Sequence, residues 1–153
     1  MKWWLNYYEE DKYIKGMCKS RKWIENRLHL PSISSQKHLV ALKFDAEQDG
    51  KIADDFEFGR KRLIPIVFSH GLTDSRGMYQ VTASEMASHG YIMFLIDHHD
   101  GTCSYTESKD GEYKVEFDDK VPFFNYEDMA AKTKLRESEI KSLIDAINKP
   151  KFL

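Results

Sequence analysis

The stretch Leu63-Ile64-Pro65-Ile66-Val67-Phe68-Ser69-His70-Gly71-Leu72 decides the fold of this chain. Its first six residues are almost continuously apolar, which is the pattern of a strand buried on both faces of a parallel sheet. Pro65 lies near the start of that strand, where a missing N–H is tolerated. The sequence therefore predicts a buried parallel strand over 63–68 that ends in a polar loop containing glycine.

A helix and a second strand are predicted directly after this loop. Apolar residues within 79–87 recur at the spacing of one helical face, and Gly90 follows as the left-handed residue that commonly ends a helix. The run 91–96, Tyr-Ile-Met-Phe-Leu-Ile, is again continuously apolar. Strand, loop, helix and strand make a βαβ unit, which implies that the two strands are parallel.

The remaining segments are expected to surround this unit within a single α/β domain over 1–153, because a chain of this length can bury one core. We expect an amphipathic aromatic segment over 1–30, the βαβ core over 62–100 and a long helix over 125–149. The predicted architecture is a parallel βαβ core with flanking helices.

Shorter features are predicted between these segments. The helix of the first thirty residues contains Gly16, where a break is one alternative. Alternation over 38–44 predicts a short strand, and the acidic stretch 45–57 predicts a solvated loop. The polar segment 102–121 is either a hairpin arm or an ordered loop. Asn125 is the expected N-cap of the last helix, with two acidic residues in the first turn.

Composition and charge argue against several classes of partner. The chain has 23 Lys and Arg against 25 Asp and Glu, interspersed along its length, so no electric field favours nucleic acid. Cys18 and Cys103 match no zinc or thioredoxin spacing, which fits a reducing compartment. No run approaches the roughly 20 apolar residues of a membrane helix, and no signal-peptide core is seen. We therefore expect a cytoplasmic protein without a nucleic-acid partner.

The loop after the first strand has the chemistry of an oxyanion hole. A strand that ends in His-Gly, then an apolar residue and a helix, is how α/β-hydrolases build half of that site. Gly71 lets the backbone approach a substrate closely, so the Leu72 N–H can point at an oxygen where negative charge develops. Such a donor is worth about 3 kcal/mol in the transition state. A plain strand-to-helix turn is the alternative that the tripeptide alone leaves open.

Three motifs follow one another along the centre of the chain. They are 64–72, which contains Phe-Ser-His-Gly-Leu; 86–92, Met-Ala-Ser-His-Gly-Tyr-Ile; and 97–100, Asp-His-His-Asp. This series resembles the platelet-activating-factor acetylhydrolases, in which P-x-V-V-F-S-H-G-L leads into a helix closing with L-A-S-H-G. The family's next strand ends in E-H-x-D, so Asp in place of Glu is a conservative departure. More loosely, 13–28 and 134–140 resemble family helices on either side of this region.

The resemblance implies an α/β-hydrolase of which this chain is an internal, partial piece. The implied activity is that of a 1-alkyl-2-acetylglycerophosphocholine esterase, which hydrolyses short sn-2 acyl esters of phospholipids by serine acyl transfer without a metal or cofactor. The family's nucleophile lies in G-H-S-x-G-G, and no G-x-S-x-G occurs in this sequence. We therefore expect the chain by itself to be inactive as an esterase. A non-catalytic α/β interaction or pseudoenzyme chain, or another esterase of the same fold, is the alternative.

The family pattern also implies roles for three residues of the loop. Leu72 would supply one backbone N–H to the oxyanion hole, while His70 and Gly71 would form the scaffold of the loop. His70 could be mistaken for a general base. Its place directly before Gly71 favours a residue that fixes the loop through hydrogen bonds of its ring.

Two adjacent histidines invite a different hypothesis. His98 and His99 stand between Asp97 and Asp100, a composition that could suggest a metal site. Adjacent residues at a strand end point in different directions, and no third ligand has a convincing spacing. We therefore expect no metal, and expect hydrogen-bonded polar residues at the carboxyl edge of the sheet.

The aromatic N-terminal segment raises the question of a lipid surface. The resemblance implies a phospholipid substrate, and an amphipathic basic helix with Trp23 and Ile24 would suit contact with a lipid surface. Packing of these aromatic residues inside the protein is the favoured alternative. An internal piece would also leave the apolar strand over 63–68 with an open edge, so we expect self-association.

Overall fold

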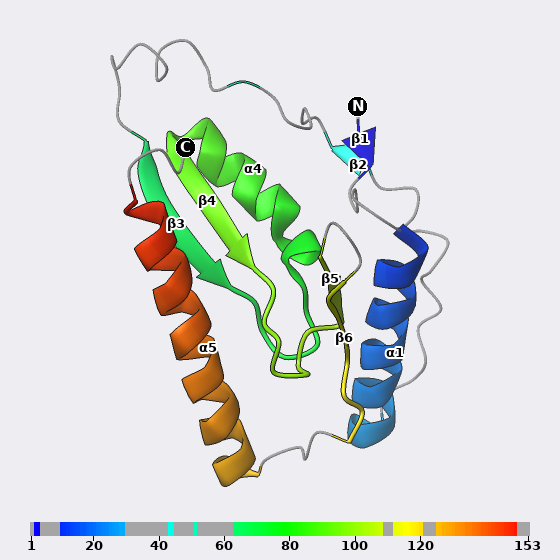
Figure 1. Ribbon diagram of the computed structural model, residues 1–153. Coiled ribbons are helices and arrows are strands. Elements are labelled where there is room, and N and C mark those ends of the chain that lie inside the picture. Colours follow the sequence, from blue (N-terminus) through cyan, green and yellow to red (C-terminus); the bar gives the residue numbers. More distant parts are fainter. Residues whose placement is uncertain are drawn as a thin grey trace.

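The computed structural model describes residues 2–3, 10–29, 43–44, 51, 63–108, 112–120 and 125–149. Helices α1 and α5 lie at opposite sides of the molecule, with a small hairpin and the loops of a parallel sheet between them (Figure 1). The elements are, in chain order, β1 (Lys2–Trp3), α1 (Glu10–Leu28), β2 (Lys43–Phe44), β3 (Ile64–Ser69), the 3-10 helix η1 (Arg76–Tyr79), α4 (Gln80–Ser88), β4 (Tyr91–Ile96), β5 (Tyr105–Glu107), β6 (Lys114–Glu116) and α5 (Tyr126–Ile147).

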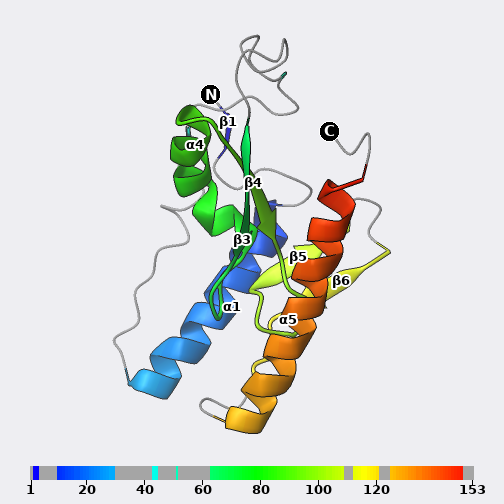
Figure 2. The same cartoon turned by 90° about the vertical axis from the view of Figure 1, so that its left-hand side faces the viewer.

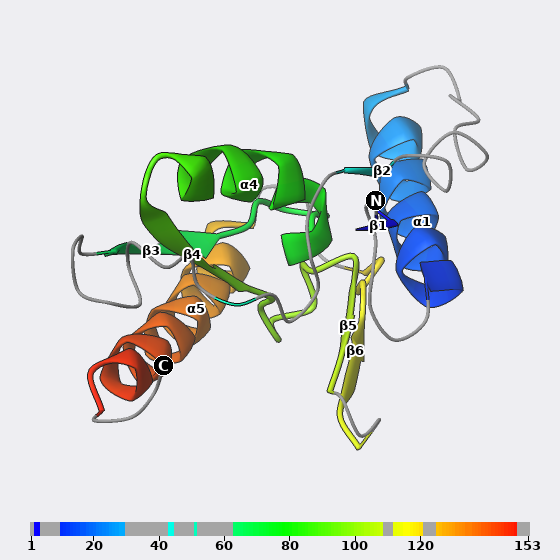
Figure 3. The ribbon, with the colours of Figure 1, turned by 90° about the horizontal axis from the view of Figure 1, so that it is seen from above.

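The centre of the chain forms the predicted βαβ unit. Strands β3 and β4 are adjacent and parallel, in a register that pairs Ile64 with Tyr91 and Ser69 with Ile96. η1 and α4 connect them, and Gly90 follows α4 with a φ of 90°. Figures 2 and 3 show α4 on one face of this sheet and α5 on the other. The predicted strands, their parallel pairing and the helix between them are therefore confirmed.

The expectation that the first strand is buried on both faces is wrong. Ile64 is 56% exposed, and the residues of β4 are only half-buried. A sheet of two strands covers little of its own surface, and among the described residues β3 pairs with β4 alone. Fully buried side chains gather instead in the loops after the two strands, where His70, His98 and Ser75 are at most 2% exposed. The best-buried part of these loops is therefore polar.

Helix α1 packs against the hairpin of β5 and β6. This hairpin lies within 102–121, the segment for which the sequence predicted either a hairpin arm or an ordered loop. The helix runs through Gly16 without a break. Gly16 lies so close to the hairpin that a Cβ there would be 2.4 Å from the Ser104 carbonyl oxygen. One turn earlier, the rings of Tyr13 and Tyr105 meet edge to face with centroids 5.0 Å apart. Gly16 is therefore a contact point between helix and hairpin, and the alternative of a break at this residue is wrong.

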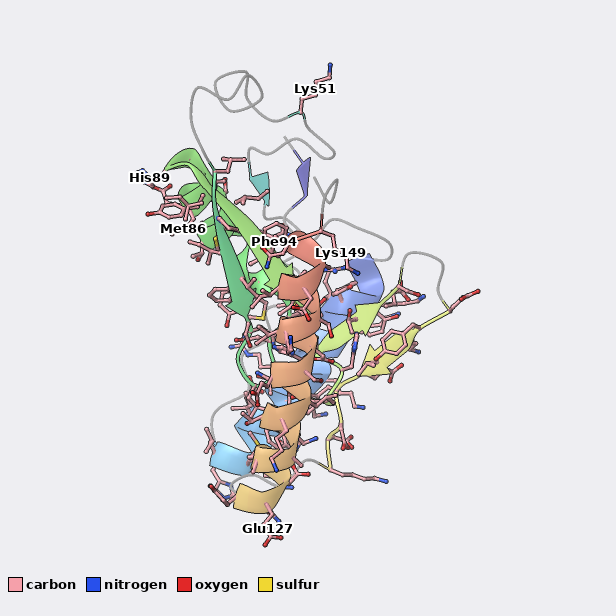
Figure 4. All side chains as sticks on the ribbon, turned by 60° about the vertical axis from the view of Figure 1, so that its left-hand side comes forward. Lys51, Met86, His89, Phe94, Glu127 and Lys149 are labelled. Atoms are coloured by element: carbon pink, nitrogen blue, oxygen red, sulfur yellow. The ribbon has the colours of Figure 1, made fainter. Side chains whose placement is uncertain are left out.

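The long C-terminal helix begins as predicted. The Asn125 side chain accepts a hydrogen bond from the Asp128 N–H at 3.1 Å, and Glu127 and Asp128 place negative charge in the first turn. Figure 4 shows Glu127 at this end of α5, while Met86 of α4 and His89, which directly follows α4, lie on the opposite side of the sheet. The cap and the acidic residues explain why the helix starts at this point.

Two predicted features fall largely outside the described residues. Of the strand expected over 38–44, only β2 is described, and it pairs antiparallel with β1. The acidic segment 45–57 is described only at Lys51. No helix in the described ranges is both long and apolar enough to cross a membrane.

Candidate functional site

The loop between β3 and η1 is held on both sides of Leu72. On one side, the Gly71 carbonyl oxygen lies 2.7 Å from Nδ1 of His70. On the other side, the Thr73 N–H donates to the Thr102 carbonyl oxygen at 2.8 Å. The backbone around the predicted oxyanion residue is therefore fixed by a neighbouring ring and by a segment that follows the second strand.

Thr73 adopts a left-handed backbone with a φ of 68°. Side chains branched at Cβ rarely adopt this conformation, which costs roughly 1–3 kcal/mol and persists only where the surroundings enforce it. Thr73 is 8% exposed, and its carbonyl accepts a hydrogen bond from Ser20 Oγ of α1 at 3.2 Å. Strain of this kind clusters at functional sites, so the loop is a candidate for one.

His70 links the ends of the two parallel strands. Its Nε2 accepts a hydrogen bond from the His98 N–H at 3.0 Å, and a backbone N–H can only donate. The ring proton must therefore be on Nδ1, which donates to the Gly71 carbonyl. Burial lowers the pKa of His70, in agreement with a neutral ring. These are the ring hydrogen bonds expected of a residue that holds the loop.

His98 and His99 share one carboxylate of α5. The His98 Nδ1 lies 2.6 Å from Glu139 Oε2, and its Nε2 lies 2.7 Å from Ser69 Oγ. The His99 N–H and Nδ1 each lie 3.1 Å from Glu139 Oε1. The prediction that these histidines are hydrogen-bonded polar residues at the carboxyl edge of the sheet is confirmed.

One arginine of α5 joins the loops after both strands. Arg136 donates from Nη1 to the His70 carbonyl at 2.8 Å. Its Nε donates to Asp100 Oδ2 at 2.7 Å, and its Nη2 donates to the Thr102 hydroxyl. Burial alone would raise the pKa of Asp100, but hydrogen bonds from Thr102 and Arg136 outweigh it and leave the pKa below its ordinary value. Arg136 therefore holds a buried carboxylate and the loop backbone together.

Three buried side chains bring atoms that could ligate a metal within 4.8 Å of one another: His70, Asp97 and Cys103. Both ring nitrogens of His70 already have backbone partners, and Asp97 lies 3.3 Å from the Arg76 guanidinium. Burial, with a smaller contribution from Asp97, raises the pKa of the Cys103 thiol, which opposes the thiolate that a metal needs. We therefore assign no metal site to this cluster.

Comparison with known proteins decides the family. The family model described as platelet-activating factor acetylhydrolase, isoform II, matches residues 3–149. The chain belongs to this family. It is thereby assigned to a family of hydrolytic esterases, and the resemblance inferred from the three central motifs is confirmed.

Individual acetylhydrolases of the family match the chain over short stretches. A platelet-activating factor acetylhydrolase of Canis lupus familiaris is 49% identical over 41 residues, which is 27% of this chain and 9% of that protein. One of Bos taurus is 38% identical over 55 residues, 36% of this chain and 12% of that protein. The matched stretches thus span a small part of these relatives. No solved structure matches the chain.

The structure brings the three residues named from the sequence into one loop and adds partners that the sequence did not reveal. His70, Gly71 and Leu72 are consecutive, so their proximity is trivial, but the groups that hold them come from elsewhere. Arg136 and Glu139 are the most important of these. Both lie in the segment that resembles a family helix, and nothing in its pattern distinguishes their side chains from solvent-exposed charges.

Proposed function

We propose that the chain carries the oxyanion loop of an acetylhydrolase with the α/β-hydrolase fold. The proposed reaction is hydrolysis of short sn-2 acyl esters of phospholipids, such as 1-alkyl-2-acetylglycerophosphocholine, by serine acyl transfer. The observation that carries the proposal is the strained loop of Gly71, Leu72 and Thr73, held at the carboxyl ends of two parallel strands in a chain of this family. Ligand sites of parallel α/β sheets lie at this edge.

The part of the reaction proposed for this chain is electrostatic. The Leu72 N–H would donate to the ester oxygen as it gains negative charge, and a preformed donor is worth about 3 kcal/mol. His70 and Thr73 would keep the peptide in place, since their hydrogen bonds fix the carbonyl before Leu72 and the N–H after it. The sequence contains no G-x-S-x-G, so we propose that the family's attacking serine is supplied from outside these 153 residues.

Contact with a lipid surface has less support than packing. Trp23 is 8% exposed, its ring meets Phe117 edge to face at 5.3 Å, and its Nε1 donates to the Asp119 carbonyl at 2.9 Å. Ile24 is half-buried. The indole would have to leave the hairpin segment before it could enter a lipid layer, so a lipid contact through Trp23 and Ile24 stays a prediction.

The test uses the protein that cells make from this gene, captured with an antibody raised against the chain. Acetate release from 1-alkyl-2-acetylglycerophosphocholine is compared with fatty-acid release from a phosphatidylcholine bearing two long acyl chains. We expect release from the acetyl substrate alone. A gene edited to Gly71→Val should lose this activity, because even a Cβ there would lie 3.1 Å from the Asp74 carboxylate. Ser84→Val, at an exposed position of α4, is the matched control.

The other outcomes distinguish the alternatives. Hydrolysis of p-nitrophenyl acetate without release of acetate from the phospholipid would indicate a different esterase of the same fold. Absence of both activities in the captured protein would indicate a non-catalytic interaction chain. Equal activity of the Gly71→Val and Ser84→Val proteins would remove the oxyanion role from this loop.

A further inference from the structure

A serine, a histidine and a carboxylate form a connected series at the end of β3. Ser69 Oγ lies 2.7 Å from Nε2 of His98, and Nδ1 of the same ring lies 2.6 Å from Glu139 Oε2. The three residues come from β3, from the segment after β4 and from α5. The register pairs Ser69 with Ile96, two residues before His98, so the Ser69 and His98 side chains point to the same face of the sheet. Figure 2 shows α5 on one face of the sheet, and Glu139 of this helix contacts the His98 ring.

The direction of the protons follows from the partners. A carboxylate oxygen accepts, so Nδ1 of His98 donates to Glu139. When the ring carries only that proton, Nε2 is an acceptor and the Ser69 hydroxyl donates to it. Glu139 is itself oriented by the His99 N–H at 3.1 Å. A hydroxyl that donates to an imidazole oriented by a carboxylate is the arrangement that activates serine nucleophiles.

His70 cannot play the same part. Both ring nitrogens of His70 bond to backbone groups, one to the Gly71 carbonyl and one to the His98 N–H. Of the His70 and His98 rings, that of His98 is therefore the one placed to take a proton from a hydroxyl. His98 is fully buried, whereas Ser69 is exposed, so a reagent would reach the pair through the serine.

Ser69 opens into a depression between β3 and α5. The depression has a volume of about 620 Å³. Isoleucines line part of it, and hydroxyl groups and charges of both signs line the rest, so it offers room for a small molecule beside Ser69. Its lining comprises Ser69, Thr133, the isoleucines Ile140 and Ile144, and the charged residues Arg136, Glu137, Lys141 and Asp145.

We propose that Ser69 is a reactive serine that forms a covalent adduct with small activated acyl or phosphonyl compounds. The Ser69 oxygen forms a bond to the acyl carbon or to phosphorus, its proton passes to Nε2 of His98, and the leaving group departs with the electron pair of the broken bond. His98 is fully buried, so we assign it no part in protonating a poor leaving group or in activating water. The reaction therefore requires a good leaving group, such as fluoride or p-nitrophenolate, and stops at the adduct.

This proposal concerns a site other than the proposed oxyanion loop. It uses neither Leu72 nor a serine from outside the chain, and it is compatible with a chain that lacks esterase turnover, because one adduct per molecule is not turnover. Failure of the proposed acetylhydrolase activity would leave it standing. Its own failure would likewise leave the oxyanion assignment untouched.

The test is stoichiometric labelling of the 153-residue chain with a fluorophosphonate. Intact-protein mass spectrometry follows the adduct, and peptide mapping locates it. We expect one phosphonyl group per chain, on Ser69, and labelling that falls to the level of heat-denatured protein in Ser69→Ala. Ser88→Ala is the matched control, because Ser88 is exposed on α4 and its hydroxyl donates to the Glu85 carbonyl. It should label at the rate of the unmodified chain.

A second variant tests the base. In Glu139→Gln the amide can donate to Nδ1 of His98, which would put the ring proton on Nε2 and prevent it from accepting. We expect labelling to slow at least about tenfold, by analogy with the loss when a triad carboxylate becomes an amide. Circular dichroism of the same samples shows whether the fold is kept. An adduct on another residue, no adduct on folded protein, or equal labelling of Ser69→Ala would overturn the proposal.

Discussion

Replacement of Arg136 by alanine should destabilise the protein more than replacement of an exposed charged residue of α5 by alanine. The guanidinium is bonded to the Asp100 carboxylate, whose side chain is 0% exposed, while the Arg136 side chain is 20% exposed. It also donates to the His70 carbonyl and to the Thr102 hydroxyl. Removal of one partner of a buried ion pair costs about 3–5 kcal/mol because the other charge stays buried. Partial exposure of Arg136 favours the lower end, about 3 kcal/mol.

The assay is urea and thermal unfolding followed by circular dichroism. A loss of about 3 kcal/mol corresponds to a fall in melting temperature of roughly 6–12 °C for a chain of this size. Lys134→Ala, which removes an exposed cation from the same helix, should change stability by less than about 0.5 kcal/mol. Adding Asp100→Asn to the Arg136→Ala protein should restore about 1 kcal/mol or more, because the stranded charge is removed.

Two results would refute this reasoning. The first is a cost of Arg136→Ala no larger than that of Lys134→Ala, which would mean that the buried carboxylate does not depend on the guanidinium. The second is an absence of rescue by Asp100→Asn. If Arg136→Ala does not fold, Arg136→Lys provides the measurement, since it keeps the charge, loses the planar fork and should cost less than the alanine variant.

Further predictions concern backbone strain, pH, packing and association. Thr73→Gly should be about 1 kcal/mol more stable than Thr73→Ala in urea unfolding, because glycine adopts a φ of 68° without strain. This is the reverse of the usual order of the two residues. A more stable alanine variant would show that the strain is not real. In the folded protein the pKa of Asp100 lies below its ordinary value of 3.8. The stability that ionised Asp100 contributes is therefore complete above pH 3.8 and is lost as the pH falls through the lower pKa of the folded state. Acid unfolding of Asp100→Asn should therefore depend less steeply on pH, and an identical acid profile would contradict this. Gly16→Ala should lower the melting temperature, because its Cβ would lie 2.4 Å from the Ser104 carbonyl oxygen. This holds although alanine is the better helix former by about 1 kcal/mol. A rise in melting temperature would disprove the close approach. With Ile64 56% exposed and an open edge on β3 among the described strands, the chain should bind a hydrophobic dye and self-associate in light scattering. A monodisperse monomer that melts above about 60 °C would be inconsistent with this last expectation.

Several elements were predictable because their signals are local. The apolar runs of β3 and β4, the helix that ends at Gly90 and the cap at Asn125 each depend on residues within a few positions of one another. The loop of His70, Gly71 and Leu72 was found for the same reason, since its three residues are consecutive. Family membership also followed from short motifs in a fixed order.

Burial and the partners of each polar group were decided by tertiary structure alone. The apolar run of β3 predicted a strand buried on both faces, but burial depends on which neighbours cover a strand, and none of them is written in the run itself. His98 bonds to residues 29 and 41 positions away, and Arg136 bonds to a carbonyl 66 positions away. Gly16 could be read as a helix breaker from the sequence, whereas the structure shows the hairpin packed against it. Local periodicity specifies helices and strands, whereas only the assembled chain determines which charge, hydroxyl or carbonyl lies opposite each side chain.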